Sequence, residues 1–435
     1  MINMQQTPKS NTYAIIIIGI LFFVFGFVTW LNGTLIPFLK LACQLENDTQ
    51  AFFVTTAFYM AYFFLALPSS LVLRKTGYKN GMALGLFIMA IGSVIFIPAA
   101  NTRSFPLFLT GLFVQGTGLA LLQTASNPYI SILGPIESAA KRISIMGICN
   151  KTAGIISPLI LGALVLKNAS SIEEKIIAAT DTTEKQMLLN ELTKRVVTPY
   201  IIITIVLVAV AVMIKLSSLP EIRSDETDEV ADTPHLKKTN ALQFPHLMLG
   251  VFCIFLYVGA EVMAGDAIGT YGRHMGMPLD QTKYFTAFTL GGMLVGYIIG
   301  IFTIPKIISQ QKALAISAVL GIIFCIGAFV SNDYTAIIFI ALLGLANALM
   351  WPSIFPLAID GLGKFTKTGA ALLVMGIVGG AIVPLIYTSL RDKVHLSNSL
   401  SFLVCMLPIY VYILYYATKG FKVGKSPITV AQIAT

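Results

Sequence analysis

Charged residues are scarce in this chain. Asp, Glu, Lys and Arg together make up 11% of it, less than half of the share of about 25% in an ordinary soluble domain. This scarcity excludes an ordinary cytosolic enzyme and a disordered chain, since both depend on charge for solubility. Cysteine is also rare, with five residues and no Cys-x-x-Cys pair. A disulfide scaffold is therefore excluded, and no zinc-site spacing is present.

Apolar residues are abundant instead and make up 56% of the 435 residues. One membrane-spanning helix needs about 20 such residues. Long apolar runs also argue against a spanning β-barrel, which would show short alternating segments. The sequence therefore predicts an all-α membrane protein with twelve transmembrane helices. We place these helices at 13–42, 50–73, 81–100, 105–133, 142–166, 198–218, 243–273, 282–302, 312–330, 334–358, 368–390 and 399–418.

The basic residues indicate topology rather than nucleic-acid binding. The formal charge is +9, but Lys and Arg lie in short gaps between apolar runs instead of forming a basic soluble face. Loops on the cytoplasmic side of a membrane are enriched in these residues. Arg74, Lys75 and Lys79, between the second and third spans, are the clearest such marker. We expect both termini in the cytoplasm and no cleavable signal, because the run from Tyr13 to Ala42 is too long for a signal core.

A composition break divides the spans into two sets of six. The stretch from Pro220 to Asn240 is acidic and then basic, as expected of a solvated linker. We therefore predict halves at 1–218 and 242–435, joined by a cytoplasmic linker at 219–241. A weak repeat six helices apart supports a parallel duplication: Met-Gly-Ile at 146–148 matches Met-Gly-Ile at 375–377. The polar segment 171–195 is interpreted as an exposed helical loop, in preference to a lid that captures substrate.

Uncharged polar residues within the spans are candidate binding groups, because polar groups in hydrocarbon need a cavity or a partner. Spacings of three or four place such residues on one helical face. Three groups stand out, each with helix packing through hydrogen bonds as its alternative. They are Asn32 beside Thr29 and Trp30, Gln123 with Asn127 and the following Asn150, and Asn347 with Trp351. Glycines 111, 116 and 118 are interpreted as a helix-packing surface.

Three charged residues lie deep within predicted spans. Lys151 is about nine residues beyond Arg142, hence roughly 13 Å into the membrane, and needs an acid or a wet cavity. Glu261 and Asp266 are candidates for cation coupling, since a buried carboxylate can take a proton or join a sodium shell. No metal site is established, although sodium near Glu261 is one option. The structural alternative is a salt bridge between Lys151 and Glu261 across the halves, which could coexist with coupling if it opens.

Several stretches together resemble the fucose/glucose/galactose permease branch of the major facilitator superfamily. These are WLNGTLIPFLK at 30–40, AFYMAYFFLALP at 57–68, GLALLQTASNPYISILGP at 118–135, RISIMGICNKTAG at 142–154 and YVGAEVMAGDAIGTYG at 257–272. The resemblance covers nearly the whole chain apart from the linker and the long external loop. It is nearest to the bacterial glucose/galactose permeases. It implies the major facilitator fold and uptake of hexoses across the bacterial inner membrane by alternating access.

The chain departs from the proton-coupled fucose symporters of this branch at two acidic positions. Those symporters carry carboxylates where this sequence has Gly33 and Gln123, whereas their span 5 asparagine is retained as Asn150. Proton coupling through these positions therefore does not carry over. Either coupling has moved to Glu261 or Asp266 with Lys151 as counter-charge, or the ion is sodium, or the protein is a uniporter.

The resulting expectation is a cation-coupled importer of neutral hexoses, glucose or galactose, and not an enzyme. It would work as a monomer in the lipid bilayer, with no cofactor beyond H⁺ or Na⁺ and no nucleic-acid partner. Candidate sugar ligands are Asn32, Gln123, Asn127, Asn150, Asn347 and Trp351, and candidate coupling residues are Glu261, Asp266 and Lys151. The alternatives are a proton-driven exporter of sugars or drugs and, in another class, a membrane-embedded glycosyltransferase-like enzyme.

Overall fold

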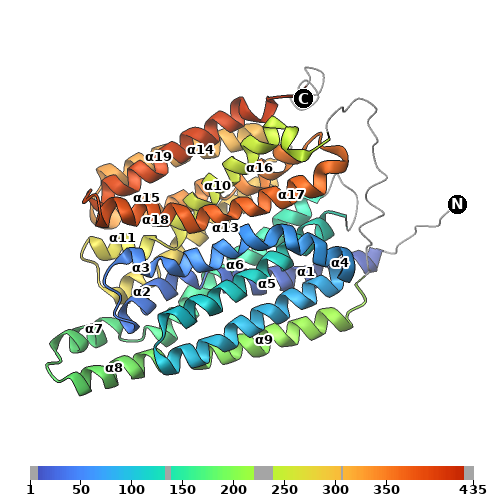
Figure 1. Cartoon of the computed structure of the whole chain (residues 1–435). Helices are drawn as coiled ribbons and strands as arrows, with labels where there is room; N and C mark the ends of the chain where they lie inside the picture. Colours follow the sequence, from blue (N-terminus) through green and yellow to red (C-terminus); the bar gives the residue numbers. More distant parts are fainter. Residues whose placement is uncertain (1–7, 133–138, 220–238, 305–306, 426–435) are drawn as a thin grey trace.

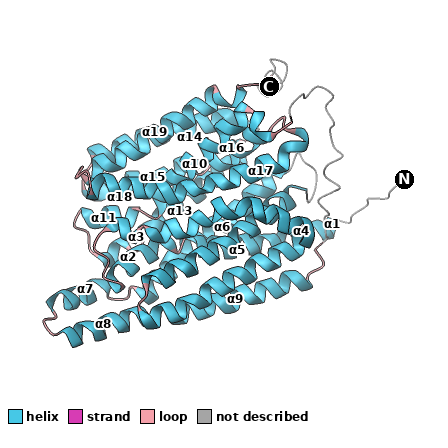
Figure 2. Ribbon diagram, viewed as in Figure 1, coloured by secondary structure: helices cyan, strands magenta, loops and turns pink. Residues whose placement is uncertain are grey.

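The computed structural model describes residues 8–132, 139–219, 239–304 and 307–425, and within these ranges the chain is helical with no strand (Figure 2). The α-helices are α1 Pro8–Thr29, α2 Asn32–Ala42, α3 Asp48–Ala51, α4 Phe53–Thr102, α5 Phe105–Ile132, α6 Ala139–Val165, α7 Ala169–Ala178, α8 Thr182–Lys194, α9 Val197–Leu216, α10 Pro245–Gly265, α11 Ile268–His274, α12 Leu279–Thr282, α13 Phe285–Thr303, α14 Gln310–Val330, α15 Asp333–Asn347, α16 Met350–Ile359, α17 Thr366–Met375, α18 Gly379–Asp392 and α19 Asn398–Thr418. Short 3₁₀ turns are η3 Ala241–Gln243, η4 Gly363–Phe365, η5 Gly376–Val378 and η6 Gly420–Lys422.

The prediction of twelve spans is confirmed. Twelve helical segments of the described chain are long and apolar enough to cross a membrane. Their ends agree with the predicted ranges to within about six residues, with two exceptions. The sixth begins earlier, because α8 runs almost directly into α9, and the seventh ends at Gly265 rather than at 273, because the helix breaks there. Two six-helix bundles lie side by side, one from α1 to α9 and one from α10 to α19 (Figure 1). Most of the predicted linker, residues 220–238, lies outside the described residues.

Several spans are interrupted near the middle of the bundle. The first span breaks at Trp30 and Leu31, between α1 and α2, and the seventh breaks at Asp266 and Ala267, between α10 and α11. The tenth span breaks between α15 and α16, and the eleventh passes through the 3₁₀ turn η5. Such breaks free backbone groups and are tolerated where a helix lines a cavity or is buried in protein. They also rotate the residues after the break onto a different face.

Glycine allows the closest helix contacts. A methyl group on Gly118 would meet the carbonyl oxygen of Gly85, and one on Gly116 would meet that of Phe58. Gly111 packs in the same way against Gly92 and Phe96. The interpretation of glycines 111, 116 and 118 as a packing surface is therefore confirmed, as expected for membrane helices held together by close backbone approach.

We expect Gly344→Ala to destabilise the second bundle. A methyl group there would overlap the backbone carbonyl of Thr289. This close contact between Gly344 and Thr289 is where α15 packs against α13. Overpacking of this kind costs about 1–3 kcal/mol, so the detergent-solubilised variant should unfold at a lower temperature. Gly291→Ala is the matched control, since nothing lies within 4 Å of the added methyl group. Equal melting temperatures for the two variants would contradict the contact.

Candidate functional site

A cavity of about 140 Å³ lies between the two bundles. Its walls come from α1, α4, α5 and α6 of the first half and from α10, α13, α16 and η5 of the second. The lining is rich in amides and aromatic rings. Its polar residues are Thr29, Gln123, Asn127, Asn150, Lys151 and Glu261, and its aromatic residues are Phe22, Phe25, Trp30, Tyr59, Tyr62, Tyr257, Tyr297 and Trp351.

Three of the predicted amides line this cavity. Gln123 and Asn127 lie one turn apart on α5, and Asn150 faces them from α6. The Gln123 side-chain nitrogen donates a hydrogen bond to the Tyr62 hydroxyl at 2.9 Å. The Asn150 side-chain nitrogen donates to the Phe22 carbonyl at 3.5 Å. The oxygen atoms of both amides are left available to accept from a ligand, because each amide has donor and acceptor ends.

Tyrosines complete the wall and were not singled out from the sequence. Tyr59 and Tyr62 come from α4, Tyr257 from α10 and Tyr297 from α13. The rings of Tyr59 and Tyr62 stack at 6.3 Å between centroids. A signal was present for these two, because they are three residues apart on one helical face and lie in the quoted motif at 57–68. Aromatic rings with a hydroxyl offer both an apolar face and a hydrogen bond.

The predicted salt bridge across the halves is present. Lys151 Nζ lies 2.7 Å from Glu261 Oε1, and the two side chains are only 7% and 13% exposed. The same ammonium lies 4.3 Å from the centroid of the Trp30 ring, a cation–π contact. Removing one partner of such a pair would leave an uncompensated buried charge, at a cost of about 3–5 kcal/mol. The pair is therefore a strong, breakable link between the bundles.

Two predicted ligands, Asn32 and Asn347, do not line the cavity in this conformation. Asn32 is 1% exposed and follows the break between α1 and α2, while Asn347 is fully buried and precedes the break between α15 and α16. The Tyr410 hydroxyl donates to Asn347 Oδ1 at 3.0 Å. The prediction that Asn347 and Trp351 share one face requires an unbroken helix. Because each helix breaks, the indole faces the cavity and its neighbouring amide does not.

Asp266 lies at the break between α10 and α11, outside the cavity lining. It is 1% exposed, and its carboxylate lies against the backbone of Gly33 of the other half, with no side-chain hydrogen-bond partner among the described residues. A methyl group on Gly33 would lie 3.2 Å from Asp266 Oδ1. An isolated buried carboxylate is costly unless it holds a proton or a cation. This acid therefore lies next to Gly33 of the first half.

The arrangement is suited to moving a solute rather than to changing it. The described residues contain no cluster of three His, Cys, Asp or Glu side chains that could hold a metal. The cavity instead combines neutral hydrogen-bonding groups with a breakable ion pair between two separate bundles. Two six-helix bundles with a polar cavity between them define a transporter built for alternating access.

Comparison with known proteins agrees with this class. The chain belongs to the Major Facilitator Superfamily, whose family model matches residues 18–385. It is 35% identical over 422 residues to a glucose/galactose transporter of Brucella abortus, with 96% of each chain covered. It is 31% identical over 385 residues to the L-fucose-proton symporter of Escherichia coli, covering 87% of each. A putative glucose/galactose transporter of Helicobacter pylori is 30% identical, with 96% of this chain and 99% of the relative covered.

A solved structure has the same arrangement of helices. The transporter FucP, crystallised in the outward conformation, matches with a TM-score of 0.74 and 28% identity, covering 94% of this chain and 98% of FucP. The family and the major facilitator fold predicted from the sequence are therefore confirmed, and the chain is a multi-pass membrane transporter rather than an enzyme.

Proposed function

We propose that the protein imports neutral hexoses, glucose or galactose, coupled to entry of a cation. The observation that carries this proposal is the cavity between the bundles, whose walls present amides, hydroxyls and aromatic rings. The names of the relatives, glucose/galactose transporters and fucose symporters, support a sugar as the cargo. Amides exchange hydrogen bonds with sugar hydroxyls, and aromatic faces stack on the apolar face of the ring.

We assign sugar contacts to Gln123, Asn127, Asn150 and Trp351, with Tyr62 beside them. The cavity of about 140 Å³ is smaller than the roughly 300 Å³ at which small-molecule sites usually begin. Sugar binding therefore requires the aromatic walls to move apart, as alternating access provides. Asn32 and Asn347 remain predicted contacts for a conformation in which their helices have turned toward the cavity.

Coupling is assigned to Glu261 and Asp266, with Lys151 as the counter-charge. Binding of a proton or sodium ion at Glu261 would release Lys151, and the link between the halves would weaken. Inward movement of one positive charge gains about 2.3 kcal/mol per 100 mV. A tenfold change corresponds to about 1.36 kcal/mol, so this charge supports roughly fiftyfold accumulation of sugar.

The proposal also covers the location of the protein in the cell, its topology and its oligomeric state. We propose the bacterial inner membrane, with both termini in the cytoplasm and a functional monomer, since one chain contains both bundles and the whole cavity. The six-helix halves are bounded at residues 218 and 242, with the linker at 219–241 facing the cytoplasm. The end of the bundle that carries α7 and α8 then faces outward (Figure 1).

Uptake of labelled glucose and galactose into proteoliposomes tests the proposal and identifies the ion. Sodium and pH gradients are imposed separately, each with and without an inside-negative potential. We expect accumulation with one gradient and its enhancement by the potential, because a charge enters with the sugar. L-Fucose and an uncharged drug serve as competitors. Net extrusion of sugar on energisation would contradict import, and downhill movement unaffected by any gradient would indicate a uniporter.

A further inference from the structure

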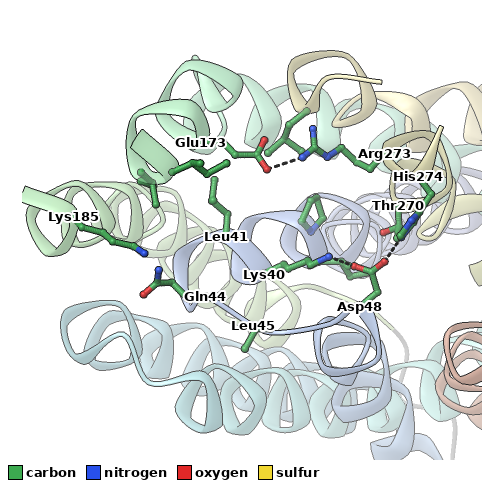
Figure 3. Close-up of a pocket in the computed structure, with 15 residues that line it drawn as sticks. Lys40, Leu41, Gln44, Leu45, Asp48, Glu173, Lys185, Thr270, Arg273 and His274 are labelled. Carbon is green, nitrogen blue, oxygen red and sulfur yellow. Dashed lines mark hydrogen bonds and ion pairs between the residues drawn. The ribbon is translucent and has the colours of Figure 1, made fainter. Parts of the chain in front are cut away.

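The hairpin formed by α7 and α8 reaches from the first half to the second. The sequence favoured a solvent-exposed loop here, and several of its side chains are exposed, but the hairpin also has buried residues, including Ile176 and Leu189. In Figure 3 its helices lie beside α2 and α11, around a pocket of about 450 Å³. Glu173 of α7 forms an ion pair with Arg273 of α11 at 2.6 Å. The hairpin is therefore attached to both bundles.

The corner between α6 and α7 is held by a pair of opposite charges from the second half. Asp280 accepts hydrogen bonds from the backbone N–H groups of Ala169 and Ser170, at 3.2 and 3.1 Å. Lys283, whose side chain is 6% exposed, donates to the carbonyl of Leu166 at 2.8 Å. An acid at the beginning of a helix and a base at the end of one are both favoured by the helix dipole. Asp280 and Lys283 therefore bind the backbone between the end of α6 and the beginning of α7.

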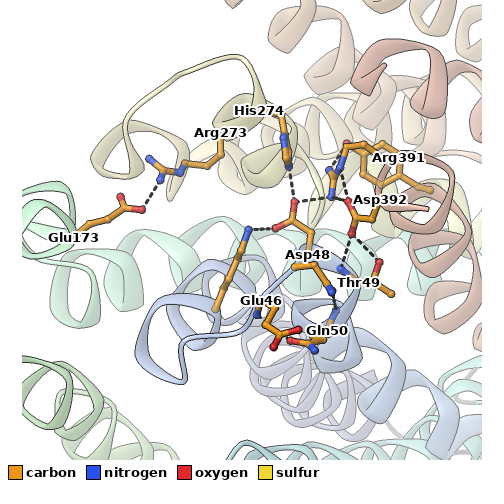
Figure 4. Close-up of polar contacts among 12 residues, drawn as sticks. Glu46, Asp48, Thr49, Gln50, Glu173, Arg273, His274, Arg391 and Asp392 are labelled. Atoms are coloured by element: carbon orange, nitrogen blue, oxygen red, sulfur yellow. Dashed lines mark hydrogen bonds and ion pairs between the residues drawn. The ribbon is translucent and has the colours of Figure 1, made fainter. Parts of the chain in front are cut away.

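A second set of contacts joins the halves at the same end (Figure 4). Asp48, at the beginning of α3, is 4% exposed and lies 2.6 Å from Arg391 of α18. His274 of α11 and Lys40 of α2 also contact the Asp48 carboxylate. The hydroxyl of Thr49 donates to Asp392 of α18 at 2.9 Å. These six side chains form one network that crosses from the first half to the second.

These contacts and the central cavity lie at different depths. The cavity includes Ile143 and Asn127, which are near the ends of α6 and α5 on the side of the termini. The corner contacts lie at the opposite end of α6, beyond Val165. These polar contacts between the halves therefore gather at the hairpin end, away from the cavity. Charge-assisted hydrogen bonds are strong and directional, so each of these contacts between the halves is either made or broken.

We propose that the α7–α8 hairpin is a strap that locks the outer end of the transporter shut, with Asp280 and Lys283 on the α6–α7 corner as its clasp. When the halves part to admit sugar from outside, the clasp, the Glu173–Arg273 pair and the Asp48–Arg391 pair separate together. Their strength sets the balance between inward- and outward-facing states. The inference rests on the proposed orientation of the chain, but it does not depend on which sugar or ion is carried.

The test measures access from outside without requiring transport. Thr286 is 2% exposed and faces Gly33 across the halves, so Thr286→Cys reports parting of the outer end. A membrane-impermeant maleimide is added to right-side-out vesicles that contain the full-length protein. Of the native cysteines, Cys43 lies toward this end; burial raises its pKa to about 11, with Arg103 partly opposing the shift. It is therefore a slow-reacting thiol at neutral pH, and vesicles without the reporter give the background.

We expect Asp280→Asn to raise the labelling rate of the reporter about tenfold, which corresponds to about 1.4 kcal/mol. Glu173→Gln should raise it to a smaller extent, because Glu173 makes one ion pair, whereas Asp280 accepts two backbone hydrogen bonds and also pairs with Lys283. Exchanging the charges, with Glu173→Arg and Arg273→Glu together, should restore slow labelling. Glu191→Gln is the matched control on the same hairpin, since its ion pair within the described part of the chain is with Arg195 of the same half.

Two results would overturn the proposal. One is an unchanged labelling rate in both Asp280→Asn and Glu173→Gln, when elution from a sizing column shows that both variants are folded. The other is labelling of the reporter only in inside-out vesicles, which would place the hairpin on the cytoplasmic side. Sugar is absent from this assay, so its result does not depend on whether the protein carries hexoses. Failure of the strap proposal can therefore be told apart from failure of the proposed hexose import.

Discussion

Gln123→Ala is expected to slow sugar uptake about tenfold at low sugar concentrations while leaving the protein folded. The side chain lines the cavity and is oriented by its hydrogen bond to Tyr62. Truncation removes a sugar contact and leaves the Tyr62 hydroxyl without this partner, so the half-saturating concentration should rise at least tenfold, or about 1.4 kcal/mol. Asn150→Ala should have a similar effect. Initial uptake rates, normalised to the amount of protein in the membrane, measure both.

Gln115→Ala is the matched control for Gln123→Ala. It removes the same side chain from the same helix, but Gln115 is buried against Ser93, to whose hydroxyl it donates at 2.7 Å, and does not line the cavity. We expect a lower melting temperature with an unchanged half-saturating concentration. If both variants shifted that concentration equally, the assignment of the sugar contacts would be wrong.

The second large effect is expected from Glu261→Gln. Glutamine retains the shape and can still accept a hydrogen bond from Lys151, but it cannot take up a proton and has no negative charge to attract a sodium ion. Accumulation should therefore fall from the roughly fiftyfold ratio available at 100 mV to equality across the membrane. Exchange of internal for external sugar, which needs no driving ion, should persist. Counterflow and active uptake in the same vesicles separate the two activities.

The unpaired Lys151 is a complication of that variant. A buried charge without its partner costs about 3–5 kcal/mol, so lost accumulation could reflect poor folding alone. Adding Lys151→Gln removes the second charge and should restore the folded yield without restoring accumulation. Active accumulation by the double variant would show that the coupling ion binds elsewhere, and Asp266→Asn is then the next variant to measure.

The twelve spans could be predicted because membrane insertion depends on local properties. Each span needs only a run of about 20 apolar residues, and the sequence shows these directly. Lys151 and Glu261 were also recognised, since charges in hydrocarbon are rare and must find a partner. Their partnership across the halves was offered as an alternative and is found at 2.7 Å.

The direction in which a side chain points was harder to predict than its position along a span. Asn347 and Trp351 share a face on an ideal helix, but the break between α15 and α16 sends them to different surroundings. The contact between Asp266 and Gly33 also depends on two breaks that meet across the halves. Backbone breaks depend on what packs around them, so spacing in the sequence could not reveal them. The contacts of Asp48 and Asp280 join residues more than a hundred positions apart, which a single sequence does not pair.

The placement of the indole rings has a practical consequence for spectroscopy. The chain contains two tryptophans, Trp30 and Trp351, and both line the central cavity. One lies against the Lys151 ammonium and the other stacks on Phe355 at 5.8 Å. Ultraviolet emission excited at the red edge of the indole band therefore originates entirely from this one place in the unmodified protein. Changes in its intensity or wavelength therefore report on the surroundings of this cavity, with no dye and no engineered label.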